Sequence, residues 1–565
     1  MKDKNKTLVI GLDGGTFRVL DPLSEEGWIP NITRLMSSGV KGVLRSTVPP
    51  TTAPAWSSFI TGKNPGKHGI FDFLQKKPLS YREFVINSCS RKGKSLWRLI
   101  SEAGKRVVVL NVPTTYPPEK INGIFISGFL TPSRKRDFVY PSALLEELKE
   151  RFGPYYLHMK TKITGQALTL QKIEALIDDC TAMLNYKAQV AEYCIKKMDP
   201  EFCMLHVWGT DRIQHELWDV IDPTHKDCNF DLAFLSRNKI RGYYRAVDSV
   251  IGKLTAAMGE ETSVVILSDH GFGPIERVMD LNAWLLGEGY IHLKKDLGTQ
   301  IKLWVWEKGL NWQSIYRLGT KVLSRMKPPK EKKGPFENLS SFRMGKRRFS
   351  LSMADVDWTK TKAYAKTGMG QIVINVQGRE SHGCVQPGQD YEEVQQEIIK
   401  KLSNLVDPET GQSIKGDLYR REDVYKGPFL ESAPDIVFIP MNNRYLTTNL
   451  TGFYSQKVFN DVSVFYGNHT MEGLFIASGP KMKKGVEIVG ANIIDLAPTI
   501  LFAMGIPILD SMDGKVLSDI FKSEFLKKNP IKFQKETDET GRNQIGLNHL
   551  DQEEALERLK DLGYI

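Results

Sequence analysis

The hydrophobic positions of this chain form two alternating patterns. Short apolar runs that start at Thr7, Arg106, Phe202 and Ser263 are bounded by Gly, Pro or Asp, which predicts buried strands. Between these runs the apolar residues recur at helical spacing, as they do over 175–198. This alternation of strand and helix favours an α/β fold with a largely parallel central sheet flanked by helices.

Side chains that commonly bind metals stand at or just past the ends of several apolar runs. Ligands of an open α/β sheet bind beyond the carboxyl ends of its strands, so we expect these side chains to meet at one edge of the sheet. Each of them alone has an ordinary structural interpretation, such as an Asp that forms a turn, and only their combination predicts a site. They are Asp13, Asp211, His215, Asp269, His270 and His469.

The residue types at this edge suit a pair of divalent cations. Carboxylates and imidazoles bind Zn²⁺ at about 2.0–2.2 Å, and Mn²⁺ is the alternative for such a ligand set. The spacing of Asp211 and His215 places both on one face of a helical turn, and the adjacent Asp269 and His270 can serve two ions. Two ions about 3.5–4 Å apart clamp both oxygens of an in-line displacement, which predicts a two-metal hydrolase of phosphorus esters.

The segment TTAPAWSSFITG offers a nucleophile for this reaction. Thr52 precedes an apolar helix that has Pro54 in its first turn and Gly62 at its end, so it could serve simply as the helix N-cap. The amide groups of that first turn would also point at an anion beside the Thr52 hydroxyl. A metal-bound threonine loses its proton readily, which favours a phospho-threonine intermediate. Both interpretations of Thr52 are open at this point.

The spacing of the six ligands predicts one catalytic core interrupted by insertions rather than tandem domains. Asp13 and His469 stand near opposite ends of a chain of 565 residues, a length that suggests more than one folding unit. The expected divisions are a first part of the core at 1–275 with a helical insertion at about 140–200, a cap or lid at 276–460, a second part of the core at 461–522, and a polar tail with a short helix at 523–565.

The amino-acid composition restricts the possible functions of the protein only slightly. The formal net charge of +11 suits an anionic substrate or surface without specifying one. The six cysteines lack C-x-x-C spacing, so we expect reduced core thiols. The first apolar run is shorter than a signal-peptide core, and no stretch approaches the ~20 apolar residues that span a bilayer. We therefore expect a soluble, cytoplasmic protein.

Five motifs taken together resemble one protein family. The chain is similar to the alkaline phosphatase superfamily, and within it to the type I phosphodiesterase/nucleotide pyrophosphatase family. The resemblance implies an alkaline-phosphatase-like core with an inserted α+β cap. The motifs are GLDGG at 11–15, T-A-P-x(6)-T-G-x-x-P-x-x-H-G-I at 52–70, D-x-x-x-H at 211–215, SDHG at 268–271, and GNHT followed by SGP from 467.

The resemblance also implies a role for each matching residue. Thr52 would be the nucleophile and would contact one of two metal ions. The reaction would be two in-line displacements through phosphorylated Thr52. One ion would be bound by Asp13, Asp269 and His270. The other would be bound by Asp211, His215 and His469.

Substrate contacts are expected from Ala53 and Trp56, although Trp56 could equally be a helix packing residue. Members of the family usually carry Asn at the position of Ala55, and this departure puts nucleotide substrates in doubt. TAPAW also lacks the Cys and Arg of the sulfatase motif, so sulfatase activity is not expected. The alternatives to a phosphodiesterase are a phosphomonoesterase or phosphonate hydrolase of the same superfamily, and a non-catalytic member that binds a phosphorylated ligand.

The expected partner is a phosphorylated small molecule or a lipid head group. No signature of specific nucleic-acid binding occurs in the sequence. Peripheral membrane contact is suggested by Trp304, Trp306 and Trp312 and by the basic runs at 327–333 and 346–348. Core packing of the tryptophans and a solvated basic loop are the simpler alternatives.

Overall fold

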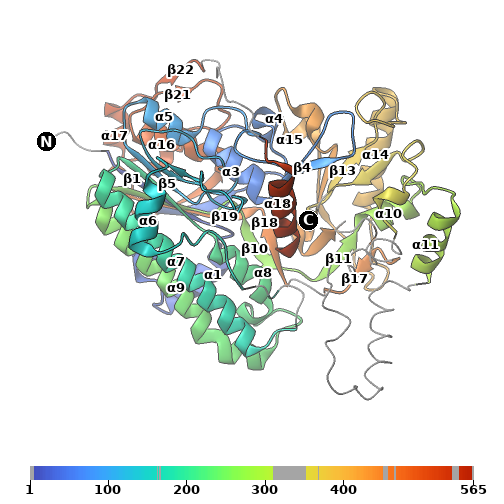
Figure 1. Ribbon diagram of the computed structural model, residues 1–565, viewed down its shortest axis with the longest axis horizontal. Coiled ribbons are helices and arrows are strands. Elements are labelled where there is room, and N and C mark those ends of the chain that lie inside the picture. The colour runs from blue at the N-terminus through green and yellow to red at the C-terminus, as the bar shows by residue number, and fades with distance from the viewer. Residues whose placement is uncertain are drawn as a thin grey trace.

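The computed structural model is built around a nine-stranded central sheet (Figure 1). It describes residues 5–308, apart from 162 and 164–166, and residues 351–562, apart from 367, 449–452, 454–455, 463–465 and 537–545. The strand order is β20-β2-β19-β9-β1-β8-β5-β6-β7. The strands are β1 (Thr7–Leu12), β2 (Val40–Arg45), β5 (Val107–Leu110), β6 (Gly123–Ile126), β7 (Val139–Tyr140), β8 (Phe202–Val207), β9 (Ser263–Leu267), β19 (Glu472–Ser478) and β20 (Val486–Asn492).

The middle of this sheet is parallel, as the sequence predicts. Strand β1 runs parallel to both β8 and β9, and β5 runs parallel to β6 and β8. Strand β19 is antiparallel to β9 and β2, and β7 is antiparallel to β6. The result is a mostly parallel α/β sheet in which the carboxyl ends of β1, β8 and β9 lie side by side.

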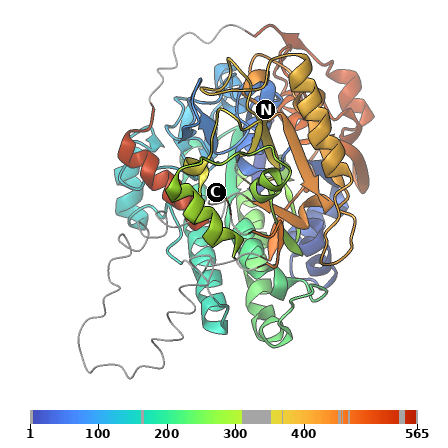
Figure 2. The same cartoon turned by 90° about the vertical axis from the view of Figure 1, so that its right-hand side faces the viewer.

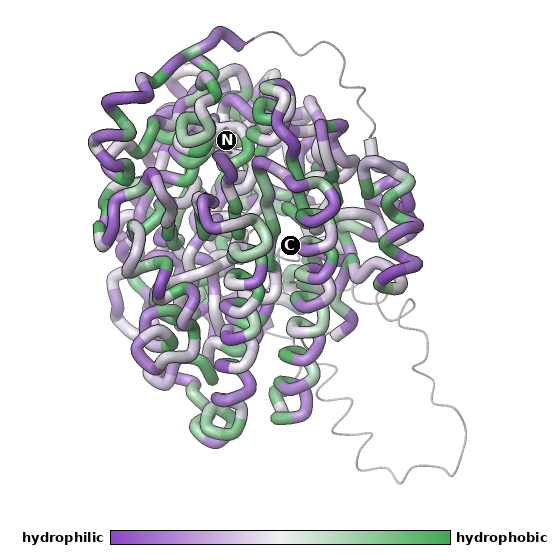
Figure 3. The backbone as a smooth tube through the Cα atoms, turned by 90° about the vertical axis from the view of Figure 1, so that its left-hand side faces the viewer, coloured by the Kyte–Doolittle hydropathy of each residue, from purple (hydrophilic) through white to green (hydrophobic). Residues whose placement is uncertain are grey.

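Helices cover both faces of the sheet because its central strands are apolar on both sides. Leu8 and Ile10 belong to the hydrophobic cluster on one face, whereas Val9 between them belongs to the cluster on the other. Hydrophilic and hydrophobic segments alternate along the outer helices (Figure 3), as expected of amphipathic elements. The first face carries α1 (Phe17–Glu25), α2 (Pro30–Ser38), α7 (Leu170–Met198), α8 (Gly209–Ile221) and α9 (Phe230–Met258), and the second carries α3 (Thr52–Thr61), α5 (Leu96–Glu102) and α16 (Leu496–Ala503).

A smaller lobe with its own hydrophobic cluster lies beside the main sheet and faces the viewer in Figure 2. Its four-stranded sheet has the order β12-β13-β15-β14, and a three-stranded sheet has the order β16-β11-β17. The domain boundaries expected from the sequence stay a prediction. The elements are β11 (Arg277–Asp280), α10 (Leu281–Gly287), α11 (Leu297–Glu307), β12 (Ala363–Ala365), β13 (Gln371–Ile374), α14 (Gln389–Ser403), β14 (Gly416–Arg420), α15 (Arg421–Val424), β15 (Ile436–Pro440), β16 (Tyr445–Thr448) and β17 (Phe459–Asn460).

A hairpin of the main lobe contacts the smaller lobe through a stacked pair of rings, a hydrogen bond and an ion pair. The hairpin is formed by β3 (Leu74–Lys76) and β4 (Glu83–Val85). The ring of Tyr81 at its turn stacks on Trp358 at a centroid distance of 3.8 Å, and its hydroxyl donates to Asn375 at 2.7 Å. Lys76 forms an ion pair with Glu380. The remaining elements are α4 (Pro65–His68), α6 (Leu144–Phe152), β10 (Gly271–Pro274), β18 (Gly467–Thr470), β21 (Ile508–Leu509), α17 (Ser523–Lys528), β22 (Phe533–Gln534) and α18 (His549–Asp561).

Further expectations from the sequence concern the tryptophans, the basic runs, membrane-spanning helices and the cysteines. Trp304 on α11 is exposed, while Trp306 contacts Phe453. Trp312 and the basic runs at 327–333 and 346–348 lie outside the described residues. None of the described helices is both long enough and apolar enough to cross a bilayer. The six cysteines are free thiols, as predicted, and three of them are buried, namely Cys180, Cys194 and Cys203.

Candidate active site

The candidate site is assembled at the carboxyl ends of three adjacent strands. Asp13 directly follows β1, and the pair Asp269 and His270 follows β9. Helix α8 begins two residues after β8 and carries Asp211 and His215 on one face, four positions apart. Because β1, β8 and β9 are parallel neighbours, these five side chains meet at one edge of the sheet.

His469 reaches the same edge by a different route than the sequence suggests. It is not at the carboxyl end of a core strand but inside β18, where it pairs with Phe272 of β10. The chain then enters β19, which runs antiparallel to β9. The beginning of an antiparallel strand lies at the carboxyl end of its parallel neighbours, so His469 arrives where the other five residues converge.

One group of potential ligands surrounds Asp211. Its Oδ1 lies 3.3 Å from Nε2 of His215 and 3.3 Å from Nε2 of His469. The two imidazole Nε2 atoms are 2.9 Å apart. All three side chains are buried, and their ligand atoms lie close enough together to hold one metal ion.

A second group adjoins the first and shares Asp211 with it. The ligand atoms of Asp13, Asp211 and His270 lie within 4.8 Å of one another. Nε2 of His270 is 3.5 Å from Oδ1 of Asp13 and 3.2 Å from Oδ2 of Asp269. Asp269 therefore stands beside this group, and the carboxylate of Asp211 faces both groups.

Backbone carbonyls orient the histidine rings. Nδ1 of His215 is 3.0 Å from the Gly467 carbonyl, and Nδ1 of His270 is 3.0 Å from the Gly271 carbonyl. A carbonyl accepts only from a protonated Nδ1, so these contacts select the tautomer whose Nε2 lone pair is available for a metal. Nδ1 of His469 has the same relationship to the Pro50 carbonyl at 3.0 Å. No sequence pattern signals these carbonyls.

A further histidine holds Asp13. His206 on β8 is buried, and its Nε2 donates to Oδ2 of Asp13 at 2.8 Å. The register of β8 against β1 pairs His206 with Gly11, two residues before Asp13. The position of His206 in an otherwise apolar strand was the available sequence signal, but the sequence alone does not assign it to Asp13.

The electrostatics of the cluster suit cation binding. Burial, followed by repulsion from Asp269 and Asp211, raises the pKa of Asp13 well above its usual range. Burial also raises the pKa of Asp269 to about 8. Burial opposes ionisation of Asp211 too, but the neighbouring His215 and His469 hold its pKa well below the ordinary value.

Two carboxylate oxygens in this cluster, Asp13 Oδ1 and Asp269 Oδ2, are buried and accept no hydrogen bond. Burying acidic oxygens without a partner is unfavourable, and a divalent cation is the partner that such a set of oxygens and imidazoles fits. Burial, followed by His469, lowers the pKa of His270 well below its ordinary value. A neutral imidazole is the form that binds a metal.

Thr52 lies beside this cluster at the start of α3. Its hydroxyl oxygen is 3.4 Å from Nε2 of His270. The expectation that Thr52 is the N-cap is wrong by one residue, because Thr51 occupies the N-cap and Thr52 is the first helical residue. Gly62 ends the helix with a positive φ of 65°, as predicted. Among the described residues, the amide groups of Thr52 and Ala53 donate to no protein acceptor.

The side chains of Ala53 and Trp56 are both fully buried, and their expected substrate contacts stay a prediction. Trp56 packs edge-on against Phe59 and His206. A Cβ at Gly11 would lie 2.5 Å from the Trp56 ring, so the indole fills the space beneath the strand that leads to Asp13. The packing interpretation of Trp56 therefore fits, and what Ala53 can offer a substrate is its amide group.

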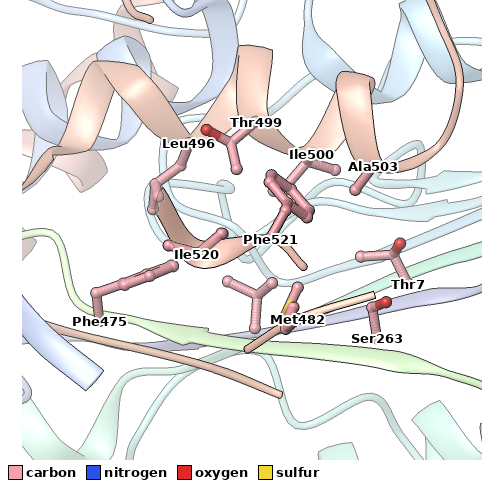
Figure 4. Close-up of a pocket in the computed structure, with 11 residues that line it drawn as sticks. Thr7, Ser263, Phe475, Met482, Leu496, Thr499, Ile500, Ala503, Ile520 and Phe521 are labelled. Atoms are coloured by element: carbon pink, nitrogen blue, oxygen red, sulfur yellow. The ribbon is translucent and has the colours of Figure 1, made fainter. Parts of the chain in front are cut away.

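An apolar cavity elsewhere in the core is not part of this site. It lies between α16 and the sheet and is lined by residues such as Phe475, Met482 and Ile500 (Figure 4). Thr7 and Ser263, which also line it, stand at the amino ends of β1 and β9. The cavity is therefore at the opposite edge of the sheet from the ligand cluster.

The family of the chain follows from its sequence. The family model of type I phosphodiesterase / nucleotide pyrophosphatase matches residues 7–459. The chain belongs to this family, which is part of the alkaline phosphatase superfamily, and the match spans both the main lobe and the smaller lobe. The resemblance expected from the five motifs is thereby confirmed.

Solved structures similar to this chain include the murine and human ectonucleotide pyrophosphatase / phosphodiesterase 5. The murine protein is 14% identical and covers 92% of this chain and 100% of its own, with a TM-score of 0.47. An inactive variant of the murine protein in complex with AMP gives the same values. The human protein is also 14% identical over the same shares, with a TM-score of 0.45. No curated protein matches the chain significantly.

Proposed function

We propose that this protein is a two-metal phosphodiesterase that acts through a phosphorylated Thr52. The observation that carries the proposal is the position of the Thr52 hydroxyl, 3.4 Å from His270 Nε2 and next to a buried cluster of three carboxylates and three imidazoles. Family membership supports hydrolysis of a phosphate ester. The assignment of Thr52 and of the ligands to two ions follows the family resemblance, and the ligand atoms of Asp211, His215 and His469 lie close enough together to hold one ion.

In this proposal Asp211, His215 and His469 would hold one ion. Asp13, Asp269 and His270 would hold the other, and Asp211 could contribute to both sites because its carboxylate belongs to both groups of ligand atoms. Two divalent cations, Zn²⁺ or alternatively Mn²⁺, would stabilise the charge that develops on the reacting oxygens. His206 keeps Asp13 in place through its hydrogen bond to Oδ2.

The Thr52 oxygen attacks phosphorus in line with the bond to the leaving group. That bond breaks as the bond between Thr52 and phosphorus forms, and the departing oxygen takes up a proton. Water then attacks phosphorus from the side vacated by the leaving group and gives up a proton, and the displaced Thr52 oxygen takes up a proton. The amide groups of Thr52 and Ala53, at the positive end of α3, can donate to the phosphoryl oxygens in both steps.

The proposed substrate is a phosphorylated small molecule or lipid head group with a diester linkage. To test this, protein loaded with Zn²⁺ or Mn²⁺ is assayed on bis-p-nitrophenyl phosphate and on p-nitrophenyl phosphate. Faster cleavage of the diester is expected. The opposite preference would favour the phosphomonoesterase alternative, and no turnover of either compound with metals fully bound would favour the non-catalytic alternative.

One observation favours the lipid version of the substrate. Helix α11 exposes Leu297, Ile301 and Trp304 on one face, each more than half exposed. We propose that this face contacts a membrane surface. Sedimentation with vesicles of phosphatidylglycerol and phosphatidylcholine should pull down the protein, and the double variant Ile301→Ser/Trp304→Ser should stay in solution. Phe533→Ser, which removes an exposed aromatic ring from another part of the surface, is the matched control.

A further inference from the structure

A short turn of the smaller lobe, Met441–Asn443, lies between β15 and β16 in an unusual backbone conformation. Its three residues have positive φ angles of 51°, 53° and 62°. This left-handed region is unfavourable for a residue that has a Cβ, although asparagine adopts it more readily than most. Strained residues persist where the surrounding structure holds them, and they cluster at functional sites. The turn therefore points to a requirement outside itself.

The two asparagines of this turn contact the segment that carries His469. Nδ2 of Asn443 donates to the main-chain carbonyl of His469 at 2.9 Å. Oδ1 of Asn442 accepts from the amide of Met471 at 3.4 Å, and its Nδ2 donates to Oε2 of Glu472 at 2.8 Å. The smaller lobe thus contacts the chain immediately around a potential metal ligand.

Asn443 supplies a hydrogen-bond partner at an open edge of β18. Among the described strands, β18 pairs only with β10, so the main-chain groups on its other edge need different partners. The carbonyls of Gly467 and His469 are two residues apart and point to the same side of the strand. The first accepts from Nδ1 of His215 at 3.0 Å, and the second accepts from Asn443. This edge is therefore bound by a potential metal ligand and by a residue of the smaller lobe.

The side chain of Asn443 has little else to bind. It is only 2% exposed, and its Oδ1 is buried without a hydrogen-bond partner. Among the described residues, its one other hydrogen-bond contact joins Nδ2 to the sulfur of Met369 at 3.7 Å, and a thioether is a weak acceptor. If Asn443 served only to make the turn, glycine would serve better, because glycine adopts positive φ without strain. The bond to His469 is the contact that glycine could not make.

We propose that Asn443 is a positioning residue of the candidate metal centre, through which the smaller lobe fixes the main chain of His469. The Pro50 carbonyl, 3.0 Å from Nδ1, orients the His469 ring, and Nε2 lies 3.3 Å from Oδ1 of Asp211. With its main chain also held, the ring has little freedom to move away from the other ligands, and such support raises metal affinity. The inference rests on the proposed two-metal site, and it adds that the smaller lobe determines the affinity for the ion at Asp211, His215 and His469.

The test is calorimetric titration of Zn²⁺ into the metal-free, full-length protein. In Asn443→Gly, the ion at the His469 group should bind about 10–100-fold more weakly than in the wild type, and the affinity for the other ion should change much less. Asn442→Gly is the matched control, because it relieves strain one residue away and leaves the bond to His469 in place. Its two affinities should stay those of the wild type.

The outcomes separate this inference from the proposed function. Two ions bound by Asn443→Gly with wild-type affinities would overturn the positioning role and leave the proposed function standing. Equal weakening by Asn442→Gly would assign the effect to the turn as a whole and would also overturn the role of Asn443. A wild type that binds no Zn²⁺ would overturn both the inference and the proposed function.

A second variant separates the hydrogen bond from backbone strain. Asn443→Ser keeps a donor of shorter reach but is more strained than glycine at positive φ. Positioning by the hydrogen bond predicts that Zn²⁺ affinity falls in the order wild type, Asn443→Ser, Asn443→Gly. A role in the turn alone predicts that the glycine variant binds Zn²⁺ better than the serine variant, and that order would refute the proposal.

Co²⁺ in place of Zn²⁺ gives a measurement that a general loss of stability would not change. The visible absorption of Co²⁺ depends on the geometry of its ligands. At saturating Co²⁺, the spectrum of Asn443→Gly should differ from that of the wild type, while the spectrum of Asn442→Gly should match it. Identical spectra of Asn443→Gly and the wild type would show that His469 keeps its place without Asn443.

Discussion

The hydroxyl oxygen of Thr52 lies 3.4 Å from Nε2 of His270, at the meeting point of helix α3 and the end of strand β9. Each residue is positioned by its own element: Thr52 is the first residue of its helix, and His270 follows an entirely buried strand. This closeness of an alcohol to an imidazole of the ligand cluster is the basis for proposing Thr52 as the nucleophile.

Replacing Thr52 by Ala should abolish turnover while leaving the metals bound. We expect a loss of at least about 10³-fold in kcat for bis-p-nitrophenyl phosphate, because the proposed covalent intermediate forms on the Thr52 hydroxyl. Metal content is measured in parallel by mass spectrometry. Thr51→Ala is the control, since Thr51 precedes the proposed nucleophile and its hydroxyl forms no hydrogen bond. Substantial activity in Thr52→Ala would contradict the covalent mechanism.

Asp211 should matter for both metal ions, whereas His215 should matter for one. The carboxylate of Asp211 belongs to both groups of ligand atoms, but His215 belongs to only one. We expect the wild type to bind about two ions per chain, His215→Asn to lose one of them, and Asp211→Asn to lose both. Asp390→Asn, at an exposed position on α14, serves as the control. Two ions retained by Asp211→Asn would show that this carboxylate is not shared.

His206 should contribute to metal affinity without binding a metal itself. Its Nε2 donates to Asp13 Oδ2 at 2.8 Å, and loss of such a supporting hydrogen bond typically weakens metal binding by about 10–100-fold. His206→Phe should therefore require more Zn²⁺ for half-maximal activity, with little change in kcat at saturating metal. His549→Phe, at a fully solvated position on α18, should show no shift. An unchanged metal requirement would leave His206 with a packing role only.

Asp219 should make the protein less stable as the pH rises. Burial raises its pKa to about 7 in the folded state, compared with about 3.9 in an unfolded chain. Between these values the folded chain holds more protons than the unfolded one, so the free energy of unfolding falls with increasing pH.

Asp219→Asn removes this effect. We expect it to be more stable than the wild type by about 1–3 kcal/mol at pH 8, but by much less at pH 5. The comparison is made by urea unfolding at both pH values, with Asp390→Asn as the exposed control. Equal gains at pH 5 and pH 8 would mean that the carboxyl of Asp219 does not titrate in this range.

The sequence predicts the centre of the fold well because two simple rules coincide there. The apolar runs at β1, β8 and β9 are buried on both faces, and each is followed closely by a potential ligand, which for β8 lies in the first turn of α8. His469 is harder to place, because it belongs to a short strand outside the main sheet whose position depends on β10. The pairing of such short strands depends on tertiary context rather than on a local pattern.

Two other features of the site are not predictable from the sequence. One is the exact start of a helix, and the other is a pair of backbone carbonyls that no sequence pattern marks. The N-cap falls on Thr51 rather than Thr52, and helix ends are uncertain by a residue or two from sequence alone. The backbone carbonyls of Gly467 and Gly271 leave no trace in the sequence.

The antiparallel strand that brings His469 to the cluster has a consequence for biosynthesis. Five of the six groups emerge from the ribosome by His270, but the sixth follows only after the whole smaller lobe has been translated. Translation proceeds at about 5–20 residues per second. The nascent chain therefore contains only five of the six potential metal ligands for on the order of 10–40 s. During that interval, a chaperone or a low concentration of free metal would keep metal ions from binding to the incomplete ligand cluster.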